Sequence, residues 1–150
     1  MALFGKDAKT YYSTVAKATS SDASSLTWVE VTNIQDLTDN FTSEDIDITT
    51  RATAASGWNA VAKGPKNGEI SFTILLDPDD TFAQALLAAW LDSTPITVLD
   101  MTGDKDEAGT FGLAANFSVG MTLSKPVKGV QTGDVTLAVY SYPEWVEGTT

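Results

Sequence analysis

The sequence predicts a mainly β domain, an antiparallel β-sandwich or barrel with one flanking α-helix and a long β-hairpin arm. Apolar and polar residues alternate in several short runs, which is typical of strands with one buried face. The segment 81–92 has the three- and four-residue spacing of a helix. The stretch 51–66 has no regular period, although strand-like runs flank it. Runs of strands with a single helix between them favour a sandwich or barrel.

The length and composition fit one soluble domain spanning 1–150. Hydrophobic residues make up 43% of the chain, enough to form a core. The longest apolar run falls well short of the ~20 residues that a membrane-spanning helix needs. The first residues lack the apolar segment of a signal peptide. We therefore expect the protein to stay in the cytoplasm where it is made, or in a particle assembled there.

The chain contains no cysteine and no histidine. Disulfides, thiol catalysis, the usual zinc ligand sets and imidazole bases are therefore excluded, which argues against an enzyme. The net charge is −11 and the single arginine is Arg51. Binding to nucleic acid requires a basic surface, and none is evident. The acidity serves either solubility or a surface that DNA passes without adhering.

The N-terminal segment 1–25 is rich in Ser, Thr, Ala and Lys. It is predicted to be an N-terminal arm that either frays or docks on a neighbouring molecule, with a strand possible over 9–15. The next run, 26–34, alternates as a strand does.

An extended hairpin loop is predicted over 39–68. Two runs have period-two alternation that separates apolar from polar residues: Ile46 and Ile48 against Asp45, Asp47 and Thr49 in 45–50, and Ile70, Phe72 and Ile74 against Glu69, Ser71 and Thr73 in 69–76. We expect these runs to pair, with the apolar face toward a core and the acidic face toward water. Asn67-Gly68 suits a tight turn at the start of the second run.

The stretch 51–66 inside this loop is long for a structureless segment of a compact domain. Such loops are usually functional or become ordered against a partner. Trp58 lies among small and polar residues there, and tryptophan is enriched at protein interfaces. We therefore expect the arm to order on another copy of the chain, with Trp58 as its anchor.

The helix over 81–92 has clear start and stop signals. Acidic residues precede it, and Thr81 with Gln84 matches a capping box. Its apolar face is expected to pack on the sheet rather than bind a cofactor: Phe82, Leu86, Leu87, Trp90 and Leu91. Ser93-Thr94-Pro95 ends it. Strands follow at 96–101, 110–124 and 134–140, and 143–150 is predicted to be a C-terminal tail with Trp145 as an aromatic anchor.

Three acidic or glycine-rich patterns resemble functional sites, but none has the residues that such a site requires. Asp45 and Asp47 point the same way, but no nucleophile or base lies near them in sequence. The run 104–107 resembles part of a calcium loop, yet its glycine is misplaced and the distal glutamate is missing. The run 64–68 lacks the spacing of a phosphate-binding loop and precedes a strand. No catalytic residue, metal or cofactor is predicted.

The order strand, long arm, strand, helix, strand over 29–101 resembles the major tail tube protein of long-tailed, siphovirus-like bacteriophages. The resemblance rests on Ser43-Glu44, on the run 46–49 with Arg51 two residues later, on 68–73, and on Asp77-Pro78-Asp79-Asp80 before the helix. Residues 1–25 and those after Tyr142 carry no match.

The resemblance implies a structural virion protein and no enzyme. Such proteins form hexameric rings that stack into a hollow tube around the tape measure protein, and terminator and tip proteins complete the tail. DNA passes through the tube only in transit during ejection into the host. The tail assembles in the host cytoplasm and uses no cofactor.

Under this resemblance, polar strand positions are expected to line the lumen: Asp45, Asp47, Thr49, Glu69, Ser71, Thr73, Asn116, Ser118, Asp134 and Thr136. Arm residues are expected to contact neighbouring subunits and rings: Phe41, Arg51, Trp58, Asn59, Lys63 and Lys66.

Two alternatives remain open from the sequence. One is a tube protein of a type VI secretion-like or other contractile apparatus, which shares the fold. The other is a monomeric carbohydrate-binding sandwich, which needs an exposed aromatic platform that tyrosines provide: Tyr11, Tyr12, Tyr140 and Tyr142.

Overall fold

The computed structural model describes residues 2–148, which form seven strands in one antiparallel sheet of order β2-β1-β5-β6-β7-β4-β3. The strands are β1 (Lys9–Ser13), β2 (Val29–Val31), β3 (Ile34–Asp47), β4 (Val61–Leu75), β5 (Ile96–Met101), β6 (Phe111–Ser124) and β7 (Thr132–Glu147). The α-helices are α1 (Arg51–Ala54) and α2 (Thr81–Asp92), and short 3-10 turns occupy Gly5–Asp7 and Ala23–Ser25. The mainly β fold with a flanking helix and a hairpin arm is confirmed.

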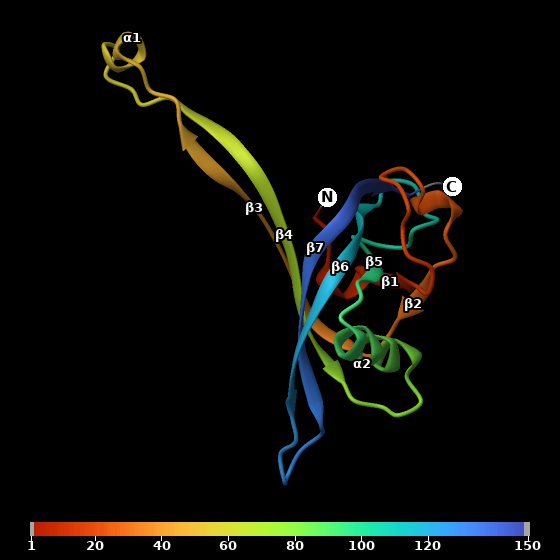
Figure 1. The fold of residues 1–150 in the computed structure, drawn as a ribbon. Helices are drawn as coiled ribbons and strands as arrows, with labels where there is room; N and C mark the ends of the chain where they lie inside the picture. The colour runs from red at the N-terminus through yellow and green to blue at the C-terminus, as the bar shows by residue number, and fades with distance from the viewer. Residues whose placement is uncertain (1, 149–150) are drawn as a thin grey trace.

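The sheet curls around a core that α2 covers (Figure 1). Its two outermost strands, β2 and β3, are consecutive in the chain and separated only by Thr32 and Asn33. The curled sheet therefore brings its edges near one another without joining them, as in an open barrel. The strands β3, β4, β6 and β7 are much longer than β1, β2 and β5, and they extend beyond the body at both ends (Figure 1).

The helix predicted over 81–92 is confirmed as α2. Its N-cap is Asp80 rather than Thr81, because an Asp80 carboxylate oxygen accepts the Phe82 N–H at 3.1 Å. Ser93 follows in the left-handed conformation (φ 55°) and ends the helix. The Phe82 ring lies 5.0 Å from Tyr12 and 6.0 Å from Phe72, at the centre of the core.

The apolar face of α2 is narrower than its sequence suggests. Phe82, Ala83, Leu86 and Ala89 are buried, whereas Trp90 and its neighbours Leu87 and Leu91 are exposed. The side chains at one edge of the predicted face thus point to solvent, where the sheet does not reach.

The N-terminal segment packs on its own domain over the described residues and does not fray, and the strand predicted within 9–15 is present as β1. β1 pairs with both β2 and β5, and Tyr11 and Tyr12 are buried. The Lys17 ammonium is fully buried and contacts Asp22 at 2.9 Å and Glu144 at 2.6 Å. These contacts hold the segment against its own domain. They also remove two of the four tyrosines from any exposed aromatic platform.

The C-terminal tail predicted at 143–150 is instead strand over most of its length, because β7 continues to Glu147. Trp145 stacks on Phe111 of the paired strand β6 at 5.3 Å, although 58% of its surface remains exposed. Tyr142 adopts φ 53° where the register of the β6–β7 pair shifts. Residues 149–150 lie outside the described part of the chain.

The predicted pairing of 45–50 with 69–76 is wrong in register. Asp45 lies opposite Lys63, and Glu69 lies opposite Asn40. Asn67 and Gly68 sit in the middle of β4 and form no turn. A period-two pattern is compatible with every even shift of register, so the turn and the bulges decide which register forms.

Candidate assembly surfaces

The arm, residues 39–68, is a two-stranded ribbon that continues β3 and β4 far beyond the body (Figure 1). Its tip is not the structureless loop predicted for 51–66. The short helix α1 caps it, with a reciprocal capping box between Thr50 and Thr53. Gly57 then reverses the chain with φ 85°, a conformation that favours glycine. The arm therefore has a defined local structure of its own.

Two β-bulges interrupt the arm and its root. At the root, Asp36 and Leu37 together face the single residue Phe72, and Asp36 has φ 45°. Further out, Gly64 and Pro65 face Glu44. Proline has no N–H to give to a ladder, so a bulge is where a strand tolerates it. Bulges bend a ribbon and increase its twist.

The arm has no core of its own. All residues from 44 to 59 are exposed except Thr49, which is half-buried. Large apolar side chains are exposed along the whole arm: Phe41, Ile46, Ile48, Trp58 and Val61. Trp58 is 79% exposed. An isolated two-stranded ribbon is marginally stable in water, so the arm is stabilised poorly by its own contacts.

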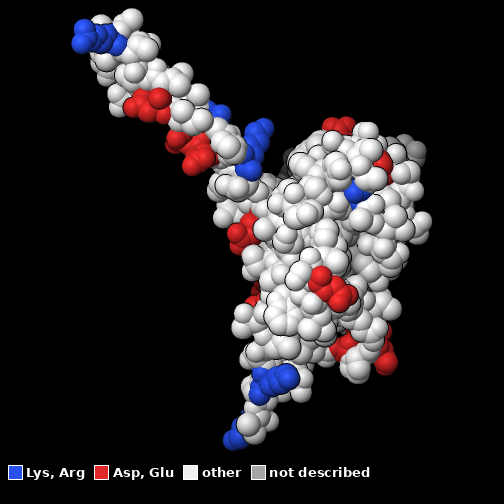
Figure 2. Space-filling view, viewed as in Figure 1, with Lys and Arg blue, Asp and Glu red and all other residues white. Residues whose placement is uncertain are grey.

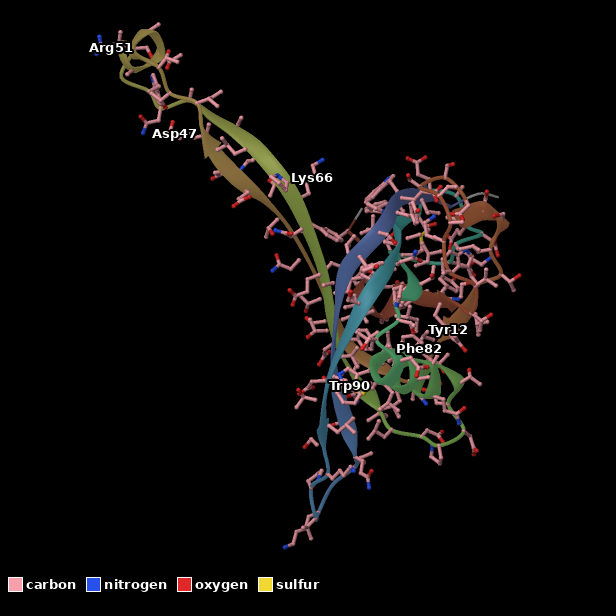
Figure 3. All side chains as sticks on the ribbon, viewed as in Figure 1. Tyr12, Asp47, Arg51, Lys66, Phe82 and Trp90 are labelled. Carbon is pink, nitrogen blue, oxygen red and sulfur yellow. The ribbon has the colours of Figure 1, made fainter. Side chains whose placement is uncertain are left out.

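The arm residues predicted to contact neighbours all lie on its surface: Phe41, Arg51, Trp58, Asn59, Lys63 and Lys66. Figure 3 shows Arg51 at the tip, with Asp47 and Lys66 closer to the body. Lys63 pairs with Asp45 across the two strands. Acidic and basic groups alternate along the ribbon (Figure 2).

A second surface is the outer face of the sheet formed by β3, β4, β7 and β6. Cross-strand partners on this face form three polar rows: Asn40, Glu69, Ala138 and Ser118; Thr38, Ser71, Thr136 and Gly120; and Gln35, Thr73, Asp134 and Thr122. The Thr73 hydroxyl donates to the Asp134 carboxylate at 3.0 Å. The opposite face of the same strands holds the buried residues Ile70, Phe72, Ile74, Val135 and Leu137. The charged residues of the rows, Glu69 and Asp134, are both acidic.

Six of the predicted lumen residues share this outer face: Glu69, Ser71, Thr73, Ser118, Asp134 and Thr136. Three others, Asp45, Asp47 and Thr49, lie on or beside the distal arm instead. Asp47 accepts the Thr49 N–H at 2.9 Å, and hydrogen bonds from the Thr49 hydroxyl and N–H lower the pKa of Asp47.

Asn116 does not belong to an exposed lining, and its prediction is wrong. Its side chain is only 3% exposed, because the segment around Lys17 crosses this part of the sheet. Its amide exchanges two hydrogen bonds with the Lys17 backbone, each 3.0 Å long. It also accepts from the Thr97 hydroxyl at 2.6 Å and donates to Ser141 at 3.0 Å. Asn116 thus fastens the N-terminal segment to the body.

Both outer edges of this four-stranded sheet are unpaired within the described chain. β3 pairs with β4 on one side and has no partner on the other. β5 covers β6 only as far as Phe117, so 118–124 are unpaired on that side. Such edges present rows of free N–H and C=O groups to another strand.

A cleft of about 790 Å³ lies at the root of the arm, between β2, β3 and the end of β5. We refer to it as the arm-root cleft. Asp100 lines it and is 8% exposed. Burial raises the pKa of Asp100 to about 8, and the neighbouring Asp39 carboxyl adds to the effect. The Thr10 hydroxyl donates to Asp100 over a long 3.4 Å.

Sequence reasoning missed this cleft. The available signal was Asp100 itself, the one charged residue in the apolar strand 96–101. A charged side chain in such a strand is either paired or held neutral.

The described residues contain no group of three or more potential metal ligands placed to hold an ion. Within residues 2–148 no helix has the length and apolarity to cross a membrane.

Comparison with protein-family models and with curated proteins gives no match. Comparison with solved structures does. A chain of the virion of a native gene transfer agent particle aligns with a TM-score of 0.72 and 14% identity, covering 97% of this chain and 99% of that one. A chain of the tail of an empty gene transfer agent particle, refined with C6 symmetry, aligns with a TM-score of 0.70 and 16% identity, covering 95% and 97%.

A third structure, the SPP1 tail tube, aligns with a TM-score of 0.68 and 16% identity, covering 99% of this chain and 81% of that one. The similarity therefore spans the arm, the curled sheet and the helix together. The chain has the fold of tail tube proteins.

Proposed function

We propose that this protein assembles into hexameric rings that stack as the hollow tail tube of a phage-like particle, the conduit for DNA ejection. The observation that carries the proposal is the four-stranded sheet, which has two unpaired edges and an acidic outer face. The full-length similarity to tail tube chains, one in a C6-symmetric tail, supports it.

Ring closure follows from the direction of the strands. β6, β7, β4 and β3 are antiparallel in turn, so the free edge of β3 and the free edge of β6 run in opposite directions. The β3 edge of one copy is therefore antiparallel to the 118–124 edge of the next. A head-to-tail contact of this kind forms a ring when the rotation closes.

In such a ring the three polar rows face the bore. Glu69 and Asp134 repeat around it, and the remaining side chains of the rows are uncharged. A wall whose only charges are negative repels phosphates, so DNA moves through without specific binding. The same bore accommodates the tape measure protein, and terminator and tip proteins close the ends. The tail then belongs to a virion assembled in the host cytoplasm.

The arm supplies contacts between subunits and rings. Trp58 and Phe41 provide exposed apolar area, and Arg51, Asn59, Lys63 and Lys66 provide polar contacts around it. Large aromatic and arginine side chains are the usual anchors of protein interfaces. Docking on a neighbour also gives the ribbon the burial that it lacks alone.

Electron microscopy of the purified protein across a concentration series tests the proposal. Hollow tubes or stacked sixfold rings are expected. Protein that stays monomeric at every concentration, also when seeded with tail tips from the producing strain, would contradict the proposal.

A further inference from the structure

We propose that the loop joining β6 to β7 in one copy inserts into the arm-root cleft of a second copy, with its lysines against Asp39 and Asp100. The loop, residues 125–131, is called the hairpin tip below. This inference rests on the proposed stacking of rings and names the contact that holds one ring on the next.

The cleft is acidic at its centre. Asp100 is almost fully buried and has the Asp39 carboxyl within hydrogen-bond reach beside it, and the Thr10 hydroxyl donates to Asp100 over a long 3.4 Å. Lys9, which also lines the cleft, is already engaged by Glu30 at 3.7 Å and Asp104 at 3.5 Å. Lys6 also lines the cleft, but no ion pair among the described residues joins either lysine to Asp39 or Asp100. The two carboxyls thus form a place for a cation.

The cleft also has an apolar wall. Phe41, Phe111 and Trp145 line it and remain 54%, 39% and 58% exposed. Aromatic side chains with this much open surface, next to a buried acid, fit a ligand that has both cationic and aliphatic parts.

The hairpin tip has that chemistry. It reads Lys125-Pro126-Val127-Lys128-Gly129-Val130-Gln131, with two lysines and no acidic residue. Val127 is fully exposed and Val130 is 65% exposed, so neither packs on its own domain. Lysine side chains gather at this projecting end in Figure 2. In a chain of net charge −11, a tip that carries only positive charge is unusual.

The positions of tip and cleft allow the contact between copies. Phe111 begins β6 and lines the cleft, whereas Ser124 ends β6 at the tip. The hairpin of β6 and β7 therefore has the cleft at the end where β6 begins and the hairpin tip at the opposite end. Figure 1 shows the long axis of β6 and β7. Within one copy the two cannot meet. When copies stack along this axis, the hairpin tip of each copy meets the arm-root cleft of the next copy. Such a head-to-tail contact builds an open filament, because it does not close into a ring.

Insertion of the hairpin tip gives the lysines of the tip and the carboxyls of the cleft the ion-pair partners that each lacks within the described part of the single chain. An ammonium group placed between the Asp39 and Asp100 carboxyls forms charge-assisted hydrogen bonds, and Val127 covers part of the aromatic wall. Burial and the Asp39 carboxyl raise the pKa of Asp100 in the single chain, and a cation beside the buried carboxyl would lower it again by favouring the ionised form.

Charge reversal at the tip tests the inference. Lys125→Glu with Lys128→Glu changes only exposed side chains, so circular dichroism and melting should match the wild type. The concentration needed for tube formation should rise about tenfold or more, from lost charge-assisted bonds. Lys125→Arg with Lys128→Arg is the matched control and should assemble normally.

A charge exchange decides whether Asp39 is the partner. Asp39→Lys alone should impair stacking, and Asp39→Lys combined with the two lysine-to-glutamate changes should restore tubes. Normal tubes from the tip variant, or no rescue by the exchange, would overturn the inference while leaving the tube itself established by the wild type. Wild-type protein that forms no tubes under seeded conditions would instead overturn the proposed function.

Discussion

The body and the arm of this protein are built on opposite principles. In the body, large side chains such as Phe82, Phe117 and Leu137 have essentially no exposed surface, and even the Lys17 side chain is buried. In the arm, Trp58, Ile46 and Ile48 face solvent. The body is thus specified by contacts within one chain. The arm has a defined backbone but buries few of its side chains within the described chain, which fits the contacts between copies that we propose for it.

The sharpest way to test the body is to remove a core side chain. Phe117→Ala deletes a fully buried ring from β6 and leaves a cavity between the sheet and its neighbours. The free energy of unfolding should fall by about 3–5 kcal/mol. Urea unfolding followed by tryptophan fluorescence measures it. A loss below about 1 kcal/mol would mean that the core is less tightly packed than described.

Stability should also fall as the pH rises through neutrality. The pKa of Asp100 is raised in the folded protein to about 8 from 3.8, mainly by burial. Its neutral form stabilises the fold at low pH, and that contribution is lost progressively from pH 4 to pH 8, by roughly 2–5 kcal/mol. Comparing denaturant unfolding at pH 5 and pH 8 measures this loss.

Asp100→Asn is the matched control, since asparagine keeps the size of the side chain and cannot ionise. Its stability should change much less between the two pH values than that of the wild type. An equal pH dependence in both proteins would assign the effect to other groups.

Substitution of Lys17 tests whether this residue holds the N-terminal segment against the body. Lys17→Ala removes a buried ammonium that Asp22 and Glu144 share, and the hydrogen bond from Lys17 lowers the pKa of Asp22. Because both carboxylates retain some contact with water, we expect a loss of roughly 2–3 kcal/mol rather than the full cost of a dry ion pair. Amide hydrogen exchange in 14–28 should be faster in the variant than in the wild type, whereas exchange in the core strands should change less. Unchanged protection there would contradict the fastening role.

Trp58 should give the smallest effect on the isolated chain. Trp58→Ala removes an exposed ring at the end of the arm, so the free energy of unfolding of the monomer should change by no more than about 0.5 kcal/mol, as for ordinary surface substitutions. Tube formation seen by electron microscopy should nevertheless be impaired. Normal tubes would show that the anchor lies elsewhere on the arm.

The sequence predicts the elements whose signals are local. The prediction of the helix at 81–92 is correct because its helical period and its acidic start both lie within one short stretch of the sequence. The alternation in β6 correctly places Ser118 and Asn116 on one face. It does not reveal that the Lys17 segment, 99 positions away, covers Asn116. The sequence pattern also does not predict the register between β3 and β4, because the bulges at Asp36 and Pro65 shift that register by single residues.

The two bulges of β3 and β4 have a mechanical consequence. Where one strand carries an extra residue, the ladder loses regular pairing and bending becomes easier there than in the intact stretches between. Asp36-Leu37 and Gly64-Pro65 therefore act as two joints along a ribbon that is otherwise held by paired strands. In a long, curving stack of subunits, the spacing between layers widens on one side and narrows on the other. A jointed ribbon follows that change by altering its angle, while the hydrogen-bonded lengths between the joints remain whole.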